Sequence, residues 1–258
     1  MQNTVRTKLG AAASSADGLP SNPRARVNRL ILARDWETLL IQAGELHGHF
    51  CPFLALGVRA GSYGLRHLGL ESDGMEEVLS IVETNSCFSD GIQYSSGCTF
   101  GNNALIYRDY GKTAVTLVAR DTGKAVRIRV RQEADGKFVT SRLMRDNFPE
   151  AEGLFDKVIA KRIGTDEDRR LLKQVWAELS LLTVKQPDGV LFEVEEVGSV
   201  ELPAYAPIYD SVTCVKCGEL VMAPKAVTVD GSELCRSCAA LGYQQLDGAG
   251  LSQVSPVE

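Results

Sequence analysis

The sequence has no long apolar run and very little histidine. No stretch of its 258 residues approaches the roughly 18 consecutive apolar residues of a membrane-spanning helix, so we expect no membrane association. The polar, alanine- and serine-rich residues 1–23 lack the apolar centre of a secretory signal, and we therefore expect a cytoplasmic protein. Histidine occurs only three times, and two of the three, His47 and His49, share a five-residue stretch with Cys51.

Positive charge is scarce beyond the first residues. Residues 1–34 carry six basic residues and one acidic residue, whereas the whole chain has a net charge of −5. The basic segment has no aromatic residue for stacking on bases before Trp36, and the remainder of the chain is acidic. Nucleic acid is therefore not expected as a partner. We interpret residues 1–28 as a solvated, disordered leader.

Cysteine is comparatively abundant. Seven cysteines in a chain without a secretory signal indicate metal binding or thiol chemistry rather than a disulfide frame. Two C-x2-C pairs lie seventeen residues apart, with a predicted hairpin turn at Asp230-Gly231 between them. Their four cysteines are Cys214, Cys217, Cys235 and Cys238. Four thiolates with no open coordination position predict a structural zinc in a zinc ribbon, with rubredoxin-like iron or a redox-active dithiol as alternatives.

The two neighbouring histidines fall at a predicted junction between helices. Asp35 is expected to be the N-cap of a helix that ends at His47, with Gly48 in a left-handed conformation after it. A second helix is expected to begin at Pro52, whose fixed φ suits the first helical position. A third is predicted from Cys87 to about Tyr94, after the strand 78–82. The junction therefore brings His47 and His49 close to the start of the second helix.

Three further cysteines remain after the zinc ribbon is assigned. Cys51 is expected at the N-cap of the second helix and Cys87 at the first position of the third. Free amides and the positive end of a helix dipole stabilise anions at both positions, so we expect both thiols to have lowered pKa values. Cys98 follows a glycine in a predicted loop that can present its sulfur. We predict a second metal site made of His47, His49, Cys51, Cys87 and Cys98.

Each of these residues alone is more commonly a buried structural residue, and only their grouping favours function. Soft and borderline donors of this kind suit zinc, iron or nickel. Asp90 is a candidate to accept a hydrogen bond from a ligating histidine. A second hypothesis makes the protein an enzyme in which Cys51 is the nucleophile or redox centre, with a histidine as its base and Cys98 or Cys87 as the resolving thiol. A third is a binding module without catalysis.

Two predicted faces have alternative interpretations. A glycine face in the second helix indicates either packing inside the chain or a dimer contact; its residues are Gly57, Gly61 and Gly64. An arginine row on the strand 125–130 favours a solvated face over an anion site; its residues are Arg127, Arg129 and Arg131. The remaining predicted elements are strands at 104–107, 113–119 and 192–197 and helices at 149–162 and 166–183.

Several separate motifs resemble the FmdE-like family, which is named after a component of formylmethanofuran dehydrogenase, over residues 35–200. They are His47-Gly48-His49-Phe50-Cys51-Pro52, Ala55-Leu56-Gly57-x-Arg59, Glu83-Thr84-Asn85-Ser86-Cys87-Phe88, Asp90-Gly91-Ile92-Gln93, Gly97-Cys98-Thr99-x-Gly101-Asn102 and Arg108-Asp109-Tyr110-Gly111-Lys112. A C-terminal zinc module is a common appendage of this family. One departure is Phe53, which stands where a glycine commonly follows Cys-Pro and is expected to narrow the cleft beside Cys51.

The resemblance implies an α+β fold in which a mixed or antiparallel sheet is packed with helices, and a homodimer. It also implies a cleft where the histidines and cysteines surround a metal, and an accessory role toward a molybdenum- or tungsten-dependent oxidoreductase of the formylmethanofuran dehydrogenase type. We expect a core domain over residues 29–202, a zinc-ribbon module over 203–245 and a flexible tail over 246–258.

Overall fold

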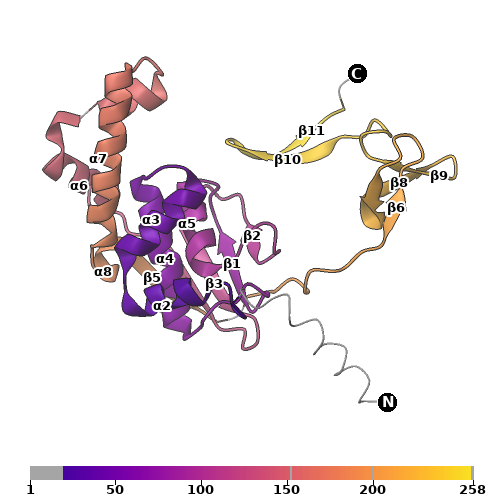
Figure 1. Ribbon diagram of the computed structural model, residues 1–258, viewed down its shortest axis with the longest axis horizontal. Coiled ribbons are helices and arrows are strands. Elements are labelled where there is room, and N and C mark those ends of the chain that lie inside the picture. The colour runs from indigo at the N-terminus through magenta and orange to yellow at the C-terminus, as the bar shows by residue number, and fades with distance from the viewer. Residues whose placement is uncertain (1–19, 152, 199, 257–258) are drawn as a thin grey trace.

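The computed structural model describes residues 20–151, 153–198 and 200–256 (Figure 1). A body of helices and one sheet is followed by a small C-terminal module of short strands, which lies apart from most of the body. None of the helices in these described ranges is long and apolar enough to span a membrane. Most of the predicted leader lies outside the described residues. Its last part is helical, because α2 begins at Ala25 and runs to Ala33.

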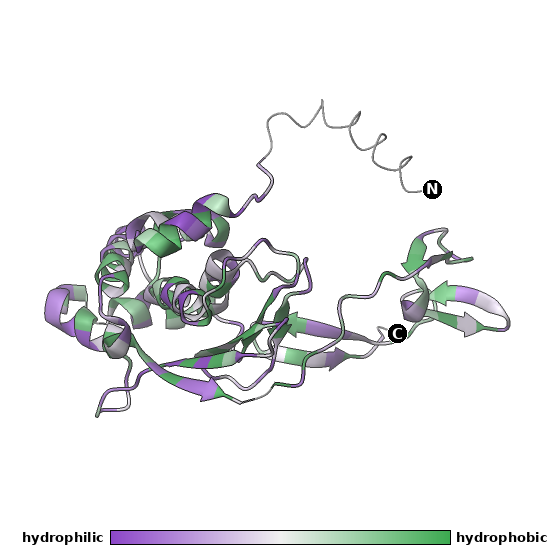
Figure 2. Ribbon diagram, turned by 90° about the horizontal axis from the view of Figure 1, so that it is seen from below, coloured by the Kyte–Doolittle hydropathy of each residue, from purple (hydrophilic) through white to green (hydrophobic). Residues whose placement is uncertain are grey.

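The sheet has five strands in the order β2-β1-β3-β4-β5. Its strands are β1 (Val78–Val82), β2 (Leu105–Tyr107), β3 (Ala114–Ala119), β4 (Ala125–Val130) and β5 (Phe192–Val197). The pairing of β1 with β2 is parallel and the other pairings are antiparallel, so the sheet is mixed. Helices cover one face of it (Figure 2). The α+β fold with a mixed sheet is therefore confirmed.

The opposite face of the sheet carries the arginine row. Val126, Ile128 and Val130 of β4 are buried. Arg127 forms a two-point ion pair with Glu83, with nitrogen–oxygen distances of 2.6 and 2.9 Å, and Arg129 pairs with Glu193. The ion pair of Arg127 with Glu83 is largely buried and that of Arg129 with Glu193 is more exposed, so the arginine face is solvated only in part.

Helix α4 (Pro52–Leu68) is the central helix of the body. It contacts α3 (Trp36–His47), α5 (Cys87–Ser96), α7 (Asp166–Val184), and strands β3 and β4. Twelve of its residues, including Leu54, Val58 and Leu65, are buried. The boundaries predicted for α3 and for the start of α4 are those of the structure. The residues around the His47–Pro52 junction are thus fixed by a buried helix.

The glycine face of α4 is used inside the chain. A Cβ at Gly57 would overlap the carbonyl oxygen of Phe88, and one at Gly61 would overlap the hydroxyl of Ser95, both on α5. A Cβ at Gly64 would lie 2.8 Å from Leu117 of β3. The dimer-contact interpretation of these glycines is therefore wrong. Gly57 and Gly61 let α4 and α5 approach closely, and Gly64 lets α4 approach β3.

The segment 149–162 is not the continuous helix that its pattern predicts. It forms a 3-10 turn, η2 (Pro149–Ala151), and a π-helical turn, η3 (Asp156–Ala160). Positive φ angles at Gly153 (79°), before η3, and at Arg162 (58°), after it, interrupt the helical geometry. An unpredicted helix, α6 (Val139–Asn147), precedes it, and α8 (Asp188–Leu191) follows α7. Helix α7 itself begins at a capping box formed by Thr165 and Asp168.

The C-terminal module consists of paired short strands. They are β6 (Ser211–Thr213), β7 (Leu220–Met222), β8 (Ala226–Val229) and β9 (Ser232–Cys235), with η4 (Ala223–Lys225) between β7 and β8. The predicted turn between β8 and β9 is present, with positive φ at Asp230 and Gly231.

A last hairpin, β10 (Tyr243–Asp247) and β11 (Gly250–Val254), replaces the flexible tail predicted from residue 246. Its turn touches the body, where Asp109 accepts a hydrogen bond from the Leu251 amide at 2.8 Å and Asn85 donates to the Asp247 carbonyl at 2.5 Å. These long-range contacts are what the local sequence pattern did not reveal.

Candidate metal centre

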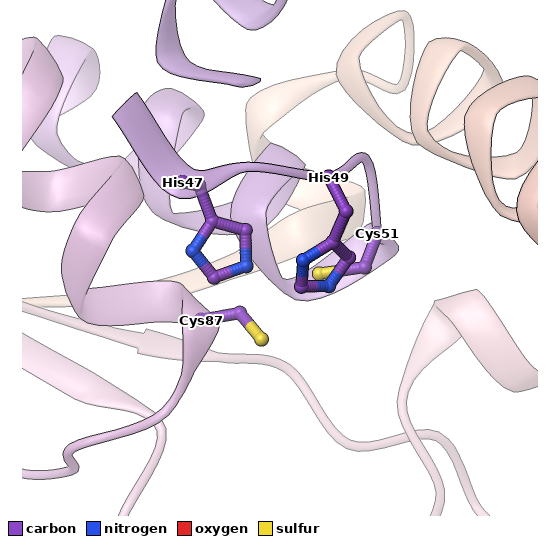
Figure 3. A group of neighbouring side chains, drawn as sticks. All are labelled: His47, His49, Cys51 and Cys87. Carbon is purple, nitrogen blue, oxygen red and sulfur yellow. The ribbon is translucent and has the colours of Figure 1, made fainter. Parts of the chain in front are cut away.

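Four of the five residues predicted for the second site converge in the structure. One ligand atom from each of four residues lies within 4.8 Å of all the others; the residues are His47, His49, Cys51 and Cys87, hereafter the His/Cys cluster. Figure 3 shows the two imidazole rings and the two thiols directed toward one another. The cluster joins the end of α3, the start of α4 and the start of α5.

Local sequence signals place three members of the cluster. The Asp35 side chain caps α3 by accepting from the Thr38 amide at 3.1 Å. The helix ends after His47 because Gly48 takes a left-handed conformation with φ of 86°. The chain then turns through His49 to Cys51, whose sulfur caps α4 by accepting from the Leu54 amide at 3.4 Å.

The fourth member comes from α5. Cys87 is the first residue of that helix, which is held against α4 by the close contacts at Gly57. Both thiols therefore stand at helix N-termini, where free amides and the helix dipole stabilise a thiolate.

The two thiols have opposite pKa shifts. The pKa of Cys87 is lowered to about 5, first by a hydrogen bond from Cys51, against the effect of burial and with help from the charges of His47 and His49. The same hydrogen bond raises the pKa of Cys51, and burial raises it further. The prediction that both thiols have lowered pKa values is thus wrong for Cys51, where these two effects outweigh the helix dipole. The surroundings therefore favour ionisation at Cys87 over Cys51.

His47 is held in a fixed orientation by an acidic neighbour. Its Nδ1 lies 2.7 Å from Oδ2 of Asp90, one turn after Cys87 on α5, as proposed for a carboxylate that orients a ligating histidine. Gln93 donates to the other Asp90 oxygen at 3.0 Å. The His47 side chain is only 9% exposed, and its Nε2 is buried without a hydrogen-bond partner in the described chain. One imidazole nitrogen is therefore anchored and the other is free to bind a metal.

Cys98 is not part of the cluster. Its buried thiol donates to the carbonyl oxygen of Val78 at 3.3 Å, and burial raises its pKa. The glycine before it bends the chain, as predicted, but the sulfur turns toward the sheet. Phe53, the departure from the family pattern, packs edge-on against Phe138 with ring centroids 5.8 Å apart.

A cavity of about 800 Å³ adjoins the cluster at His49. Trp176 of α7 lines it, with its ring centroid 5.9 Å from that of His49. Three basic residues, Arg162, Arg169 and Lys173, also line it. Trp176 lies within the helix predicted at 166–183, but sequence reasoning overlooked the cavity. The i, i+4, i+7 spacing of Arg169, Lys173 and Trp176 was the signal that could have indicated a shared helix face.

The four cysteines of the C-terminal module also converge. Their four sulfur atoms all lie within 4.8 Å of one another. Backbone hydrogen bonds from Cys217 and Cys235 lower the pKa of Cys214 to about 6, which favours the thiolate that binds zinc. All four ligands come from this segment alone, as in closed structural zinc sites.

Two family models match the chain. Residues 46–193 match the model described as "FmdE, Molybdenum formylmethanofuran dehydrogenase operon", and residues 207–241 match "Prokaryotic dksA/traR C4-type zinc finger". The second match and the four converging thiols identify the C-terminal module as a C4-type zinc finger.

Two known proteins are similar to the chain. A probable S-adenosyl-L-methionine-binding protein of Archaeoglobus fulgidus is 40% identical over 235 residues, which cover 90% of this chain and 58% of that protein. The chain therefore spans less than two thirds of the length of this relative. The crystal structure of a tungsten formylmethanofuran dehydrogenase FmdE-like protein from Syntrophus aciditrophicus is 22% identical, with a TM-score of 0.46, and covers 79% of this chain and 91% of that one.

Proposed function

Because this chain belongs to the FmdE family, we propose that its His/Cys cluster binds a metal ion in addition to the zinc of the C-terminal finger. Two imidazoles and two thiols form a borderline-to-soft donor set, which suits zinc, iron or nickel. Four such donors meet the coordination number of a tetrahedral ion.

One observation carries this proposal. The Nε2 atom of His47 is buried and unpartnered within the described chain, while Nδ1 is held by Asp90 at 2.7 Å. An unpaired buried nitrogen costs about 1–3 kcal/mol, so such atoms usually have a partner. Ligation to a metal supplies that partner, and the hydrogen bond to Asp90 fixes the ring in the required orientation.

The surrounding residues define what the centre can do. Of the four donors, His49 is exposed and borders the cavity, whereas Cys51 is buried. A bound metal would keep the thiols ionised. The chain itself holds the two thiols at helix N-termini and excludes water on the Cys51 side.

The test is metal content by mass spectrometry. We expect about two metal ions per chain in the wild type and about one in Cys51→Ser and Cys87→Ser, because the zinc finger remains. Asp90→Asn is the matched variant: it should retain both ions but lose the second to a chelator at roughly tenfold lower concentration, since Asp90 orients a ligand rather than ligating. One zinc ion in the wild type and in every variant would sink the proposal.

We further propose that the protein is accessory to a molybdenum- or tungsten-dependent oxidoreductase of the formylmethanofuran dehydrogenase type. The family match supports this partner class. Isolation of the tagged chain from its native cells should enrich molybdenum or tungsten in the eluate, whereas the Cys51→Ser protein serves as the control for dependence on the cluster. Absence of both elements from a stable, metal-loaded preparation would contradict the accessory role.

A homodimer is also part of the proposal. Large apolar side chains stand exposed along the linker and the zinc finger: Tyr205, Ile208, Tyr209, Val215, Leu220 and Met222. Exposed apolar patches of this kind mark interaction surfaces, and a second copy would cover them. Light scattering should give twice the chain mass, reduced to one chain mass in the Ile208→Glu, Leu220→Glu double variant. A wild-type monomer at high concentration would refute the dimer.

The same geometry favours one alternative. Two adjacent thiols with imidazoles beside them also suit a thiol-dependent enzyme, and the lowered pKa of Cys87 favours that thiol over Cys51 as the nucleophile. Alkylation distinguishes the two functions: a metal-held thiolate should resist iodoacetamide until a chelator is added, whereas a free one should react at once.

Binding of S-adenosyl-L-methionine, which the name of the relative describes, is less well supported by the cavity than metal binding is by the His/Cys cluster. S-adenosyl-L-methionine carries a sulfonium, an ammonium and a carboxylate group, so its net charge is positive. The cavity already presents three positive side chains, which disfavour a cationic ligand there.

A further inference from the structure

The cavity beside His49 has a composition that metal binding does not explain. It lies between the end of α3, the η3 segment and α7, and its volume is about 800 Å³. Pockets for small molecules have roughly 300–1,000 Å³ and combine an apolar lining with a few polar groups. The size therefore suits one ligand of moderate mass.

One wall of the cavity is aromatic and apolar. The half-buried ring of Trp176 lies between His49 and Phe155, with centroid distances of 5.9 and 6.2 Å. Val158, Ile159 and Leu172 complete the apolar lining. A flat heterocycle would bury its faces against this wall.

The rim of the cavity is positive. In the described ranges, neither Arg162 nor Lys173 has a carboxylate within 4.0 Å, and Arg169 pairs only with the exposed Asp166 at 2.8 Å. Arg169 and Lys173 are also four residues apart on α7, where like charges repel each other. An anion bound between them would remove this repulsion, and guanidinium groups match the geometry of phosphate oxygens.

Arg162 occupies a strained backbone position. Its φ is 58°, directly after the end of η3, a position that usually holds glycine. An arginine there is conformationally unfavourable, and strained positions of this kind are often retained where a side chain has a function. That side chain lines the cavity.

We propose that this cavity binds a nucleotide-type ligand, an aromatic heterocycle that carries two or more phosphate charges. The ring lies against Trp176, and the phosphates are held by Arg162, Arg169 and Lys173. Binding does not require a metal in the His/Cys cluster, although His49 borders both sites. The ligand class follows from the combination of an aromatic wall with three clustered cations.

The test uses the only two tryptophans of the chain. Trp36 stacks on Arg59 and Arg66 and does not line the cavity, so the Trp36→Phe protein reports on Trp176 alone. The affinity for ADP obtained from this fluorescence should be at least tenfold higher than the affinity for adenosine, because only ADP carries phosphates that can contact the three cations. Equal affinity for the two ligands, or no response to either, would overturn the proposal.

Matched charge variants locate the phosphates. Lys173→Glu should weaken ADP binding tenfold or more, whereas Arg170→Glu, an exposed position of α7 outside the cavity, should leave it unchanged. Equal losses in both variants would show that only the overall charge matters and would overturn the proposal. Metal content, expected to be unaffected, keeps this result separate from the fate of the metal-binding proposal.

A backbone variant separates binding from folding. Arg162→Gly removes the guanidinium but relieves the strained φ, so ADP affinity should fall tenfold or more without any loss of thermal stability. Arg34→Gly gives the same relief at φ of 57° after α2, away from the cavity, and should leave ADP binding intact. Unchanged ADP affinity in Arg162→Gly would show that the phosphates bind elsewhere.

Discussion

Replacing Gly57 with alanine should destabilise the protein by about 3 kcal/mol and dismantle the His/Cys cluster. The added methyl group would overlap the backbone carbonyl of Phe88 and lie 3.0 Å from the Cα of Gly91. Backbone cannot move aside as a side chain can, so the cost falls at the upper end of the range for overpacking. Helices α4 and α5 would have to separate.

That separation acts directly on the site. Cys51 caps α4 and Cys87 begins α5, so the distance between their sulfurs depends on how closely the two helices approach. Metal content of Gly57→Ala should fall toward that of Cys51→Ser, while chemical denaturation reports the loss of stability. Gly91→Ala, whose methyl group would overlap the Leu54 carbonyl, should behave in the same way.

Gly101→Ala provides the matched control. No atom lies within 4 Å of a Cβ built there, and its φ is not positive, so its stability should change by less than about 0.5 kcal/mol. A Gly57→Ala protein with wild-type stability and full metal content would show that the helix contact does not position the thiols.

The parts of the site that could be predicted from sequence are those with local causes. Asp35, Gly48 and Pro52 are capping residues whose effects reach only a few positions, and they correctly place His47 and Cys51 at helix ends. Cys87 was placed by the same logic. The contact between the two helix starts is not local; it was predicted from the grouping of histidines and cysteines, and the resemblance to a family also implied it.

The errors arose where local signals leave a direction open. The glycine before Cys98 predicts a bend but not the side to which the sulfur turns. In the structure the thiol donates a hydrogen bond to the Val78 carbonyl. Spacing shows that Gly57 lies on a flat helix face but not whether that face meets the same chain or another. The cavity exists because the segment before α7 contains a π-helical turn instead of a regular helix, and residue patterns do not distinguish the two.

Removal of the Arg59 side chain should be the most destabilising change outside the site. Arg59 is 3% exposed and joins α4 to the end of α7 and to α8. Its guanidinium donates to the carbonyls of Val184 and Gln186 and to the Asp188 carboxylate, the last at 2.5 Å. Arg59→Met would leave the Val184 and Gln186 carbonyls without this donor and Asp188 with Arg66 alone, which should cost about 3–5 kcal/mol in urea or guanidinium denaturation.

Arg66 offers a matched comparison on the same helix. It also contacts Asp188, at 3.1 Å, and the Trp36 ring, at 5.2 Å, but it makes no hydrogen bond to the two carbonyls. Arg66→Met should therefore cost no more than about 1 kcal/mol. If both methionine variants lost the same stability, the carbonyls would not be the reason for the importance of Arg59.

The charge on Asp188 adds a pH dependence to the same prediction. Burial opposes ionisation of this carboxyl, but the hydrogen bond and charge of Arg59 prevail and hold its pKa below the usual value. A lowered pKa in the folded state means that the ion pair stabilises the protein fully above about pH 4 and loses this effect as the pH falls through the folded pKa. The difference in unfolding free energy between wild type and Asp188→Asn should therefore shrink on acidification. A difference that stayed constant from pH 7 to pH 2 would show that the hydrogen-bond geometry, rather than the carboxylate charge, holds α8 against α4.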